Sequence, residues 1–516
     1  MADKKSGVYY YLTDNSIRPG GGSGFGGVVL MFTPKGDVGK LITVTSQNYQ
    51  ELLGYDLDYN ENFLALDVML AQVTKLNVIR LNKESKVNWL AWNGTGGGAP
   101  VTSSLTYDKA SDIPLVSPNY SVWAAHKYPG DWGTFGVRFS LSGKETTNVI
   151  DQEYLLEYAE NSGSSWGSPL NSYVFSLNPT AQNYYFNGDF GDVVFGFSDD
   201  FLSVSTNFKT FVKAFGTNFL KLVNGSAGTQ VFESDDVLGV KSLLNKLPCD
   251  TVLVNARAIS DSSVLKAVMD VCASQDRSFF IDVPDAGHND DGSLNALDTI
   301  SWVESAGFLG DTGKYGQLLA GINLVKHGAF TLQTPPSAYL FEAYAKMYAN
   351  TGTTNYPPAG YTTGSVSASQ LMDSDFGVFG DDLKTARVNY ITSGSRGVCI
   401  WEQRTLYNLG GSDLSYANTV FILRDLKLRI MDFMDQFTFR YTTPMQLLNI
   451  QSGLTTILND MTTNNFLVNY QLNVPSYADA QAAGRELNID IKVSVISGAE
   501  VINIRVGLEN AANLTA

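Results

Sequence analysis

The sequence predicts a multidomain protein of the α/β and α+β classes, with an α/β core, an inserted β-rich domain, a C-terminal α+β domain and terminal β-strand arms. Three observations predict this. The 516 residues exceed the roughly 250–300 that one hydrophobic core supports. Strand–helix–strand patterns occupy two stretches, separated by a region rich in glycine, serine and aromatic residues. Two long amphipathic helices and alternating strands follow near the end.

These changes in pattern divide the chain into six segments. We expect an N-terminal linker arm at 1–27, the first part of the core at 28–88, the inserted β-rich domain at 89–235, the second part of the core at 236–398, the C-terminal domain at 399–488, and the C-terminal strands and arm at 489–516.

The first segment is predicted to be a strand on a flexible link. An apolar, aromatic run comes first, and a glycine-rich stretch at 20–27 follows it. The run is too short for a signal peptide, so we expect a chain that folds in a cytoplasm. A strand held this way at a chain end is typical of an arm, whose residues are Val8, Tyr9, Tyr10, Tyr11 and Leu12.

The core begins with a buried strand at Val28–Phe32. A short helix at Ser46–Leu53, with Ser46 as its cap, and a second helix at Phe63–Val73 are predicted next. Leu76–Leu81 reads as another strand.

Short alternating strands then predict the inserted β-rich domain, for example at Gly136–Leu141, Ser172–Leu177 and Asp192–Phe197. The α/β pattern resumes with a strand at Thr251–Val254, a helix capped by Asp261 and a strand at Ser278–Val283. A strand–helix–strand unit of this length implies a parallel pair.

Helices are also predicted at Leu294–Ala306 and Ser337–Tyr348. Later, apolar residues recur every three or four positions over Leu423–Phe437 and again over Leu447–Met461. Thr443 is a cap for the second of these helices, and we expect the two to pack as an antiparallel pair.

The chain ends in two alternating strands. In the first, apolar residues alternate with Asp490, Lys492 and Ser494; the apolar ones are Ile489, Ile491, Val493 and Val495. The second comprises Val501, Ile502, Asn503, Ile504, Arg505 and Val506.

Composition excludes several classes of function. The net charge of −16 disfavours nucleic acid and anionic membranes as partners, since both need a basic surface. No apolar run approaches the roughly 18 residues that span a bilayer. The three cysteines, Cys249, Cys272 and Cys399, are scattered, which favours reduced, buried thiols.

Two patterns suggest chemistry. The glycines of Gly22–Gly27 satisfy G-x-G-x-x-G, but a strand follows where a dinucleotide site needs a helix, so we expect no cofactor. An acidic loop follows the strand at 278–283, where α/β sheets place ligands; its candidate residues are Asp282, Asp285, His288, Asp290 and Asp291. The alternative hypothesis is therefore a metal-dependent α/β enzyme that uses the Asp282–Asp291 loop, although its glycines and proline favour a solvated loop.

Read in order, several segments resemble the contractile tail-sheath family, which includes R-type bacteriocin and type VI secretion sheaths. The segments are Gly7–Tyr9, Val28–Gly36, Thr43–Ser46, Asn77–Leu81, His126–Gly133 with Val137–Phe139, Pro335–Ala338 with Pro357–Tyr361, Arg404–Leu406 and Ala499–Val506. The chain departs from the family pattern at Thr134, where asparagine is usual, and between Ser337 and Pro357.

The resemblance implies a structural protein of a virion rather than an enzyme. Sheath subunits stack as six-membered rings around an inner tube, and they contract without nucleotide hydrolysis or cofactors. The inserted domain would then be the outer one and the C-terminal domain the inner one. Implied partners are other copies of the chain, the inner tail-tube protein, and baseplate and tail-terminator proteins. Tube proteins themselves are usually much shorter chains.

The resemblance also implies where subunits join. The N-terminal arm at 8–12 and the C-terminal arm at 501–506 would each add a strand to a neighbour's sheet, of which 489–495 would be part. We further predict that a helix of the C-terminal domain faces the tube through Arg424, Lys427 and Arg429.

Overall fold

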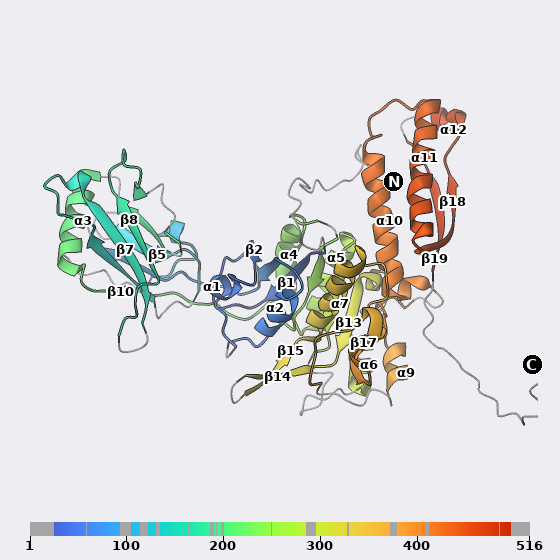
Figure 1. Cartoon of the computed structure of the whole chain (residues 1–516), viewed down its shortest axis with the longest axis horizontal. Helices are drawn as coiled ribbons and strands as arrows, with labels where there is room; N and C mark the ends of the chain where they lie inside the picture. Colours follow the sequence, from blue (N-terminus) through green and yellow to red (C-terminus); the bar gives the residue numbers. More distant parts are fainter. Residues whose placement is uncertain are drawn as a thin grey trace, which may run out of the picture.

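Figure 1 shows the fold of the chain as a computed structural model. The structure describes residues 25–57, 59–92, 105–113, 122–130, 135–161, 165–185, 190–191, 193–197, 201–248, 250–284, 296–327, 330–371, 379–408, 412–483 and 486–496. Both predicted arm strands, 8–12 and 501–506, lie outside these residues. The described residues form an elongated molecule with a β-rich part at one end and a helical hairpin at the other (Figure 1).

An eight-stranded sheet forms the centre of the molecule, in the order β17-β16-β13-β12-β11-β1-β3-β2. Neighbours from β3 to β16 pair in parallel, whereas β2 and β17 are antiparallel edge strands. Every residue of β1 is buried, as expected for a parallel strand covered on both faces. The strands are β1 Gly27–Met31, β2 Leu41–Val44, β3 Leu76–Arg80, β11 Val252–Val254, β12 Phe279–Asp282, β13 Gly316–Ala320, β16 Val388–Gly394 and β17 Gly397–Trp401.

Helices cover both faces of this sheet and divide its core into two clusters of buried residues. One face packs on α1 Tyr49–Leu53, α2 Phe63–Leu70 and α7 Pro336–Thr351. The other packs on α4 Val237–Leu244, α5 Ser262–Ser274, α6 Ala296–Ser305 and α9 Gly380–Thr385. The remaining core elements are α8 Gly360–Thr363 and the hairpin of β14 Asn323–His327 and β15 Phe330–Thr334.

Most core predictions are confirmed. The strands β11 and β12 form the predicted parallel pair, and Asp261 caps α5 by accepting hydrogen bonds from the backbone of Ser263 and Val264 at 2.9 and 3.0 Å. The prediction of Ser46 as a cap is wrong. Helix α1 starts only at Tyr49, and the side chain of Asn48 accepts the N–H of Thr45 at 2.7 Å instead.

The insertion contains two antiparallel sheets with an aromatic core. A three-stranded sheet has the order β4-β5-β9 and a four-stranded sheet the order β10-β6-β7-β8. Their strands are β4 Trp89–Trp92, β5 Val122–His126, β6 Phe135–Leu141, β7 Glu153–Glu160, β8 Asn171–Ser176, β9 Val193–Phe197 and β10 Leu220–Lys221. The β-rich fold class is confirmed, but α3 Phe201–Phe215 was not predicted. It packs on the sheet through Phe208, Phe211 and Val212.

A junction that we call the neck joins the insertion to the core, and it consists of residues 82–89, 126–130 and 223–229. The two connecting segments pair with each other as a ladder: the backbones of Lys83 and Thr229 exchange hydrogen bonds at 3.1 and 2.9 Å, and those of Lys86 and Ser226 at 2.9 and 3.1 Å. The third segment joins through Gly130, whose N–H donates to Lys86 O at 3.0 Å.

Arg80, at the end of β3, ties the neck to the core. Its side chain is 3% exposed, and burial lowers its pKa to about 10. The guanidinium donates to five backbone carbonyls at 2.6–3.4 Å, those of Thr33, Pro34, Gly36, Pro129 and Ala227. One cation thus holds both the core loop at 33–36 and two segments of the neck.

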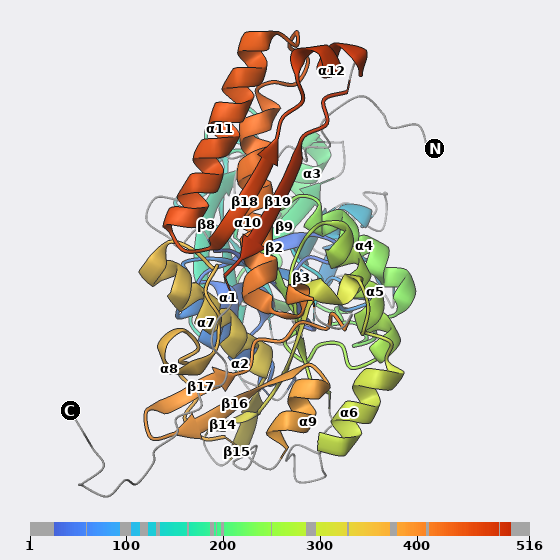
Figure 2. The same cartoon turned by 90° about the vertical axis from the view of Figure 1, so that its right-hand side faces the viewer.

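The C-terminal part is a helical hairpin covered by a two-stranded sheet (Figure 2). Its elements are α10 Ala417–Asp435, α11 Pro444–Thr463, β18 Leu467–Asn473, α12 Tyr477–Ala482 and β19 Asp490–Val495. The antiparallel helix pair and the Thr443 cap, which accepts the N–H of Gln446 at 3.2 Å, are confirmed. The boundary expected between 398 and 399 falls inside β17, so the core sheet extends to Trp401.

Candidate assembly interface

The two-stranded sheet of the C-terminal part is a candidate site for adding strands. β18 and β19 pair antiparallel from Leu467 and Val495 to Asn473 and Asp490. Among the described residues each of these strands has only the other as a neighbour, so one edge of each remains open there. An open edge presents unpaired N–H and C=O groups and is a template for another strand.

The inner face of this sheet explains the alternation predicted at 489–495. Ile491, Val493 and Val495 pack against the cluster of buried residues between α10, α11 and the sheet, while Asp490, Lys492 and Ser494 are exposed. Ile489 precedes the strand and is half-buried. The side chains predicted for the receiving sheet are therefore oriented by their own subunit, and the strand addition itself stays a prediction.

The partner strand β18 was missed from the sequence. Its apolar residues Leu467, Tyr470 and Leu472 also face the helices, but a register shift between Leu467 and Asn469 interrupts their alternation. A strict alternation of apolar and polar residues would have predicted this strand from the sequence. The register shift interrupts that alternation, so the signal is lost.

The three cations predicted to face the tube have different environments. Arg424 is 7% exposed, its Nη1 donates to Ser278 Oγ at 3.3 Å, and its guanidinium lies over the Phe421 ring at 4.3 Å. The prediction for Arg424 is therefore corrected, because α10 packs this side of its surface against the core and the charge is held inside the subunit.

Lys427 and Arg429 are exposed but paired. Lys427 forms an ion pair with Asp276, and Arg429 pairs with Asp425 at 2.9 Å and Asp460 at 2.8 Å. Their role in contacting a tube stays a prediction.

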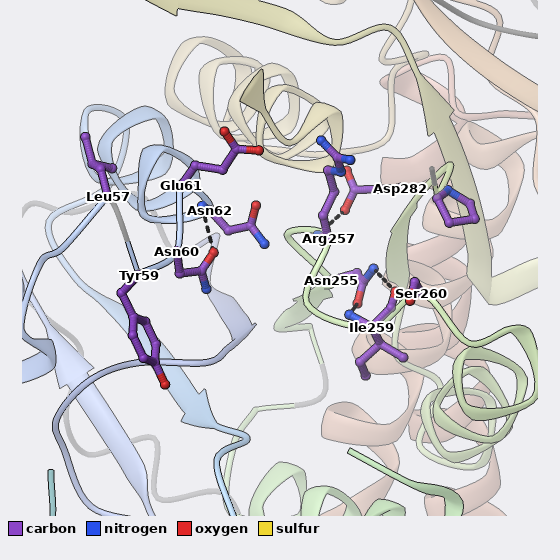
Figure 3. Close-up of a pocket in the computed structure, with 11 residues that line it drawn as sticks. Leu57, Tyr59, Asn60, Glu61, Asn62, Asn255, Arg257, Ile259, Ser260 and Asp282 are labelled. Carbon is purple, nitrogen blue, oxygen red and sulfur yellow. Dashed lines mark hydrogen bonds between the residues drawn. The ribbon is translucent and has the colours of Figure 1, made fainter. Parts of the chain in front are cut away.

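A crevice lies at the carboxyl ends of β11 and β12, between the residues that follow these strands and the loop before α2 (Figure 3). After β1 the chain passes through β2 to the neighbouring strand β3, whereas after β11 it goes to β12 on the opposite side, so this is the point where α/β sheets commonly bind ligands. Its cavity has a volume of about 470 Å³ and is lined by Leu57, Tyr59, Asn60, Glu61, Asn62, Asn255, Arg257, Ile259, Ser260, Asp282 and Pro284.

Asp282, the first residue of the alternative enzyme hypothesis, is bonded within the fold. It is 1% exposed; its Oδ1 accepts the N–H of Ser337 at 2.7 Å, and its Oδ2 accepts Ser337 Oγ and the N–H of Arg257, both at 2.8 Å. Burial raises the pKa of this carboxyl, and the bonds from Ser337 and Arg257 oppose the rise. Asp282 thus joins the first turn of α7 to the tight turn after β11.

The rest of the acidic loop, Asp285, His288, Asp290 and Asp291, lies outside the described residues. Within the described residues, no group of three or more histidine, cysteine, aspartate or glutamate side chains is arranged to hold a metal ion. In the same part of the chain, no helix is both long and apolar enough to cross a membrane.

Comparison with known proteins shows which solved structures share this fold. No family model and no curated protein sequence matches the chain. A sheath tail protein from Desulfitobacterium hafniense has a similar structure, with a TM-score of 0.53 and 12% identity over 91% of this chain and 93% of that chain. A sheath tail protein from Listeria innocua is similar with a TM-score of 0.56 and 11% identity, over 91% of this chain and 95% of that one. The chain therefore has the fold of sheath tail proteins.

Proposed function

We propose that this protein is the structural subunit of a contractile tail sheath. It polymerises as stacked six-membered rings around an inner tube and contracts to drive the tube through a bacterial envelope, without hydrolysing nucleotide. The observation that carries the proposal is the shared fold with two sheath tail proteins over 91% of the chain. The order of the sequence segments that resemble the sheath family supports it independently.

In this proposal the joints between subunits are strands exchanged between copies. Residues 8–12 and 501–506 of neighbouring copies add to the open edges of β18 and β19. At roughly 0.5–1.5 kcal/mol for each hydrogen bond, four to six bonds contribute on the order of 2–9 kcal/mol before the entropy of ordering. The glycines at 20–27 then let subunits move relative to one another while the joints hold.

The proposed partners follow from this role. They are other copies of the chain, the inner tail-tube protein, and the baseplate and tail-terminator proteins at the two ends. The site of action is the tail of a virion assembled in the host cytoplasm. No cofactor is required, because the extended sheath stores the free energy that its contraction releases through additional burial of subunit surface.

The proposal is tested by electron microscopy of the purified protein after negative staining. We expect hollow tubes with a regular helical lattice. A protein that stays monomeric at every concentration and salt condition, alone and with tube protein, would contradict the proposal.

Removal of Met1–Gly20 tests the strand joints. We expect a folded, soluble monomer that no longer polymerises, because the donated strand is missing while the core elements are intact. Circular dichroism and light scattering measure the two properties, and long tubes formed by the shortened protein would show that this arm is not a joint.

A further inference from the structure

A cleft lies beside the neck, between the insertion and the core loop at 37–40, and we call it the neck cleft. Its cavity has a volume of about 810 Å³, compared with about 470 Å³ for the crevice of Figure 3. Residues of the core loop, the neck and the insertion line it together. Ligand sites occur preferentially at such boundaries between domains, in cavities of roughly 300–1,000 Å³. The neck cleft therefore has the place and the size of a site for a small molecule.

The floor of the neck cleft is apolar and fixed in position. Ala110, Trp123 and Val194 line it, and they belong to or pack against the hydrophobic cluster on the three-stranded sheet of the insertion. The Trp123 ring lies so close to Gly196 of β9 that a Cβ atom there would be 2.7 Å from the ring. The sheet thus holds the indole in one place at the wall of the cleft.

The indole of Trp123 has an unused hydrogen-bond donor. Trp123 is 7% exposed, and its Nε1 has no hydrogen-bond partner among the described residues. In the same cluster, the Nε1 of Trp89 donates to Leu105 O at 3.1 Å. Buried indole N–H groups usually find an acceptor, and the absence of one needs a reason such as a bound molecule. The missing acceptor at Trp123 therefore points to a ligand.

The rim of the neck cleft carries a small excess of positive charge. The described residues that line it include four lysines and three acids, whereas the whole chain has 35 basic and 51 acidic residues. Such a local excess in an acidic chain favours an anion over a cation. The lysines are Lys40, Lys86, Lys109 and Lys127, and the acids are Asp37, Glu84 and Asp108.

The lysines of the rim differ in their partners. Lys40 is 3.0 Å from Asp37, and Lys86 forms an ion pair with Asp108. Lys109, in contrast, is exposed and forms no ion pair with any described residue. Lys109 is thus the cation of the rim that can hold an anionic group.

The backbone places this cation beside the apolar floor. Lys109 directly precedes the short helix Ala110–Asp112, and Ala110 is part of the floor. An anionic group paired with Lys109 would therefore lie next to apolar surface. The third acid, Glu84, is exposed on the neck side of the cleft.

We propose that the neck cleft binds a small apolar carboxylate. Its apolar body covers Ala110 and Val194, its charge is attracted by Lys109, and a carboxylate oxygen accepts the hydrogen bond of Trp123 Nε1. This site goes beyond the proposed function, and neither depends on the other.

Octanoate, 1-octanol and octylammonium test the proposal, because they share one apolar body and differ in their headgroup. Isothermal titration calorimetry with the full chain is expected to show saturable binding of octanoate at one site per chain, and weaker binding of the other two probes. The difference measures the preference for an anion. Absence of saturable octanoate binding, or equal affinity for the three probes, overturns the proposal.

Lys109→Glu and Trp123→Phe locate the site. The first reverses the charge of an exposed side chain, and the second removes the indole donor while keeping an aromatic ring. We expect the Kd for octanoate to rise at least about tenfold in each variant. The matched controls are Lys144→Glu and Trp302→Phe, since Lys144 is exposed in the insertion, Trp302 is half-buried on α6, and neither lines the cleft.

Thermal unfolding of each variant without probe shows whether it folds, and Lys109→Glu alone decides if Trp123→Phe does not. An unchanged octanoate affinity in Lys109→Glu overturns the proposal, and so does an equal loss of affinity in Lys144→Glu. Because these titrations use the unassembled chain, none of the outcomes bears on the proposed sheath function.

Discussion

Where the neck joins the core, a buried cation is bonded within the chain, whereas the turn between α10 and α11 exposes large apolar side chains. Arg80, which ties the neck to the core, is 3% exposed and donates to five carbonyls. Phe439, in the turn between α10 and α11, is 88% exposed and has a φ of +61°. The two regions differ in where their contacts are completed: the joint at the neck is completed within the chain, whereas the apolar side chains in the turn between α10 and α11 remain exposed there.

The largest effect is expected from Arg80→Ala. The substitution leaves the five carbonyls without their donor and should lower the free energy of unfolding by about 3–5 kcal/mol. Urea unfolding measures the loss, and proteolysis at residues 126–130 and 223–229 should accelerate. The control is Arg429→Ala, whose exposed ion pairs contribute at most about 1 kcal/mol. Equal losses in the two variants would break the comparison.

The second largest effect is expected from acid, which should lower the free energy of unfolding through His126 in the neck. His126 is fully buried beside Tyr158 Oη, at 3.1 Å from Nε2, and the N–H of Tyr128, at 3.3 Å from Nδ1. Burial, with the charge of Lys35, holds its pKa well below 6.5. A lowered pKa in the folded state means that stability is complete above pH 6.5 and is lost as the pH falls, because only the unfolded chain takes up the proton.

The expected loss is about 2 kcal/mol between pH 7 and pH 5. Chemical unfolding at several pH values measures it, and His126→Gln should show a smaller dependence. If the variant and the wild type lose stability in parallel, other groups are responsible for the acid sensitivity.

The smallest effect on stability is expected at the exposed cations of α10. Lys427→Glu with Arg429→Glu should lower the free energy of unfolding by under about 1 kcal/mol for each site. If these cations face the tube, co-sedimentation with tube protein falls while polymerisation of the sheath is unchanged. Unaltered tube binding would mean that another surface makes this contact.

The features predicted from the sequence are those with local signals. Buried strands such as β1, the caps Asp261 and Thr443, and the helical periodicity of α11 each depend on residues within a few positions of one another. Of the two strands in the C-terminal sheet, β19 was predicted, because its apolar and polar residues alternate regularly. Strand β18 was not predicted, because a register shift interrupts its alternation.

Features that depend on distant contacts were not predicted. The Arg80 guanidinium donates a hydrogen bond to the carbonyl of Ala227, which is 147 positions away in the sequence. No pattern of neighbouring residues predicts that contact. Arg424 was predicted to face a tube, but α10 also packs on the core, and the Arg424 side chain donates to Ser278 there. Helix α3 lay in a stretch whose aromatic and glycine content is typical of strands, and tertiary packing of Phe208 decided its conformation.

The paired connectors of the neck have a consequence for engineering. Because Lys83 and Thr229 are directly bonded partners, the whole insertion leaves and re-enters the core at one place, as the loop of a hairpin does. Folds accept a foreign module most readily where its two ends meet side by side. An enzyme, epitope or fluorescent protein grafted between these positions would be carried by every copy of the chain without interrupting the core sheet.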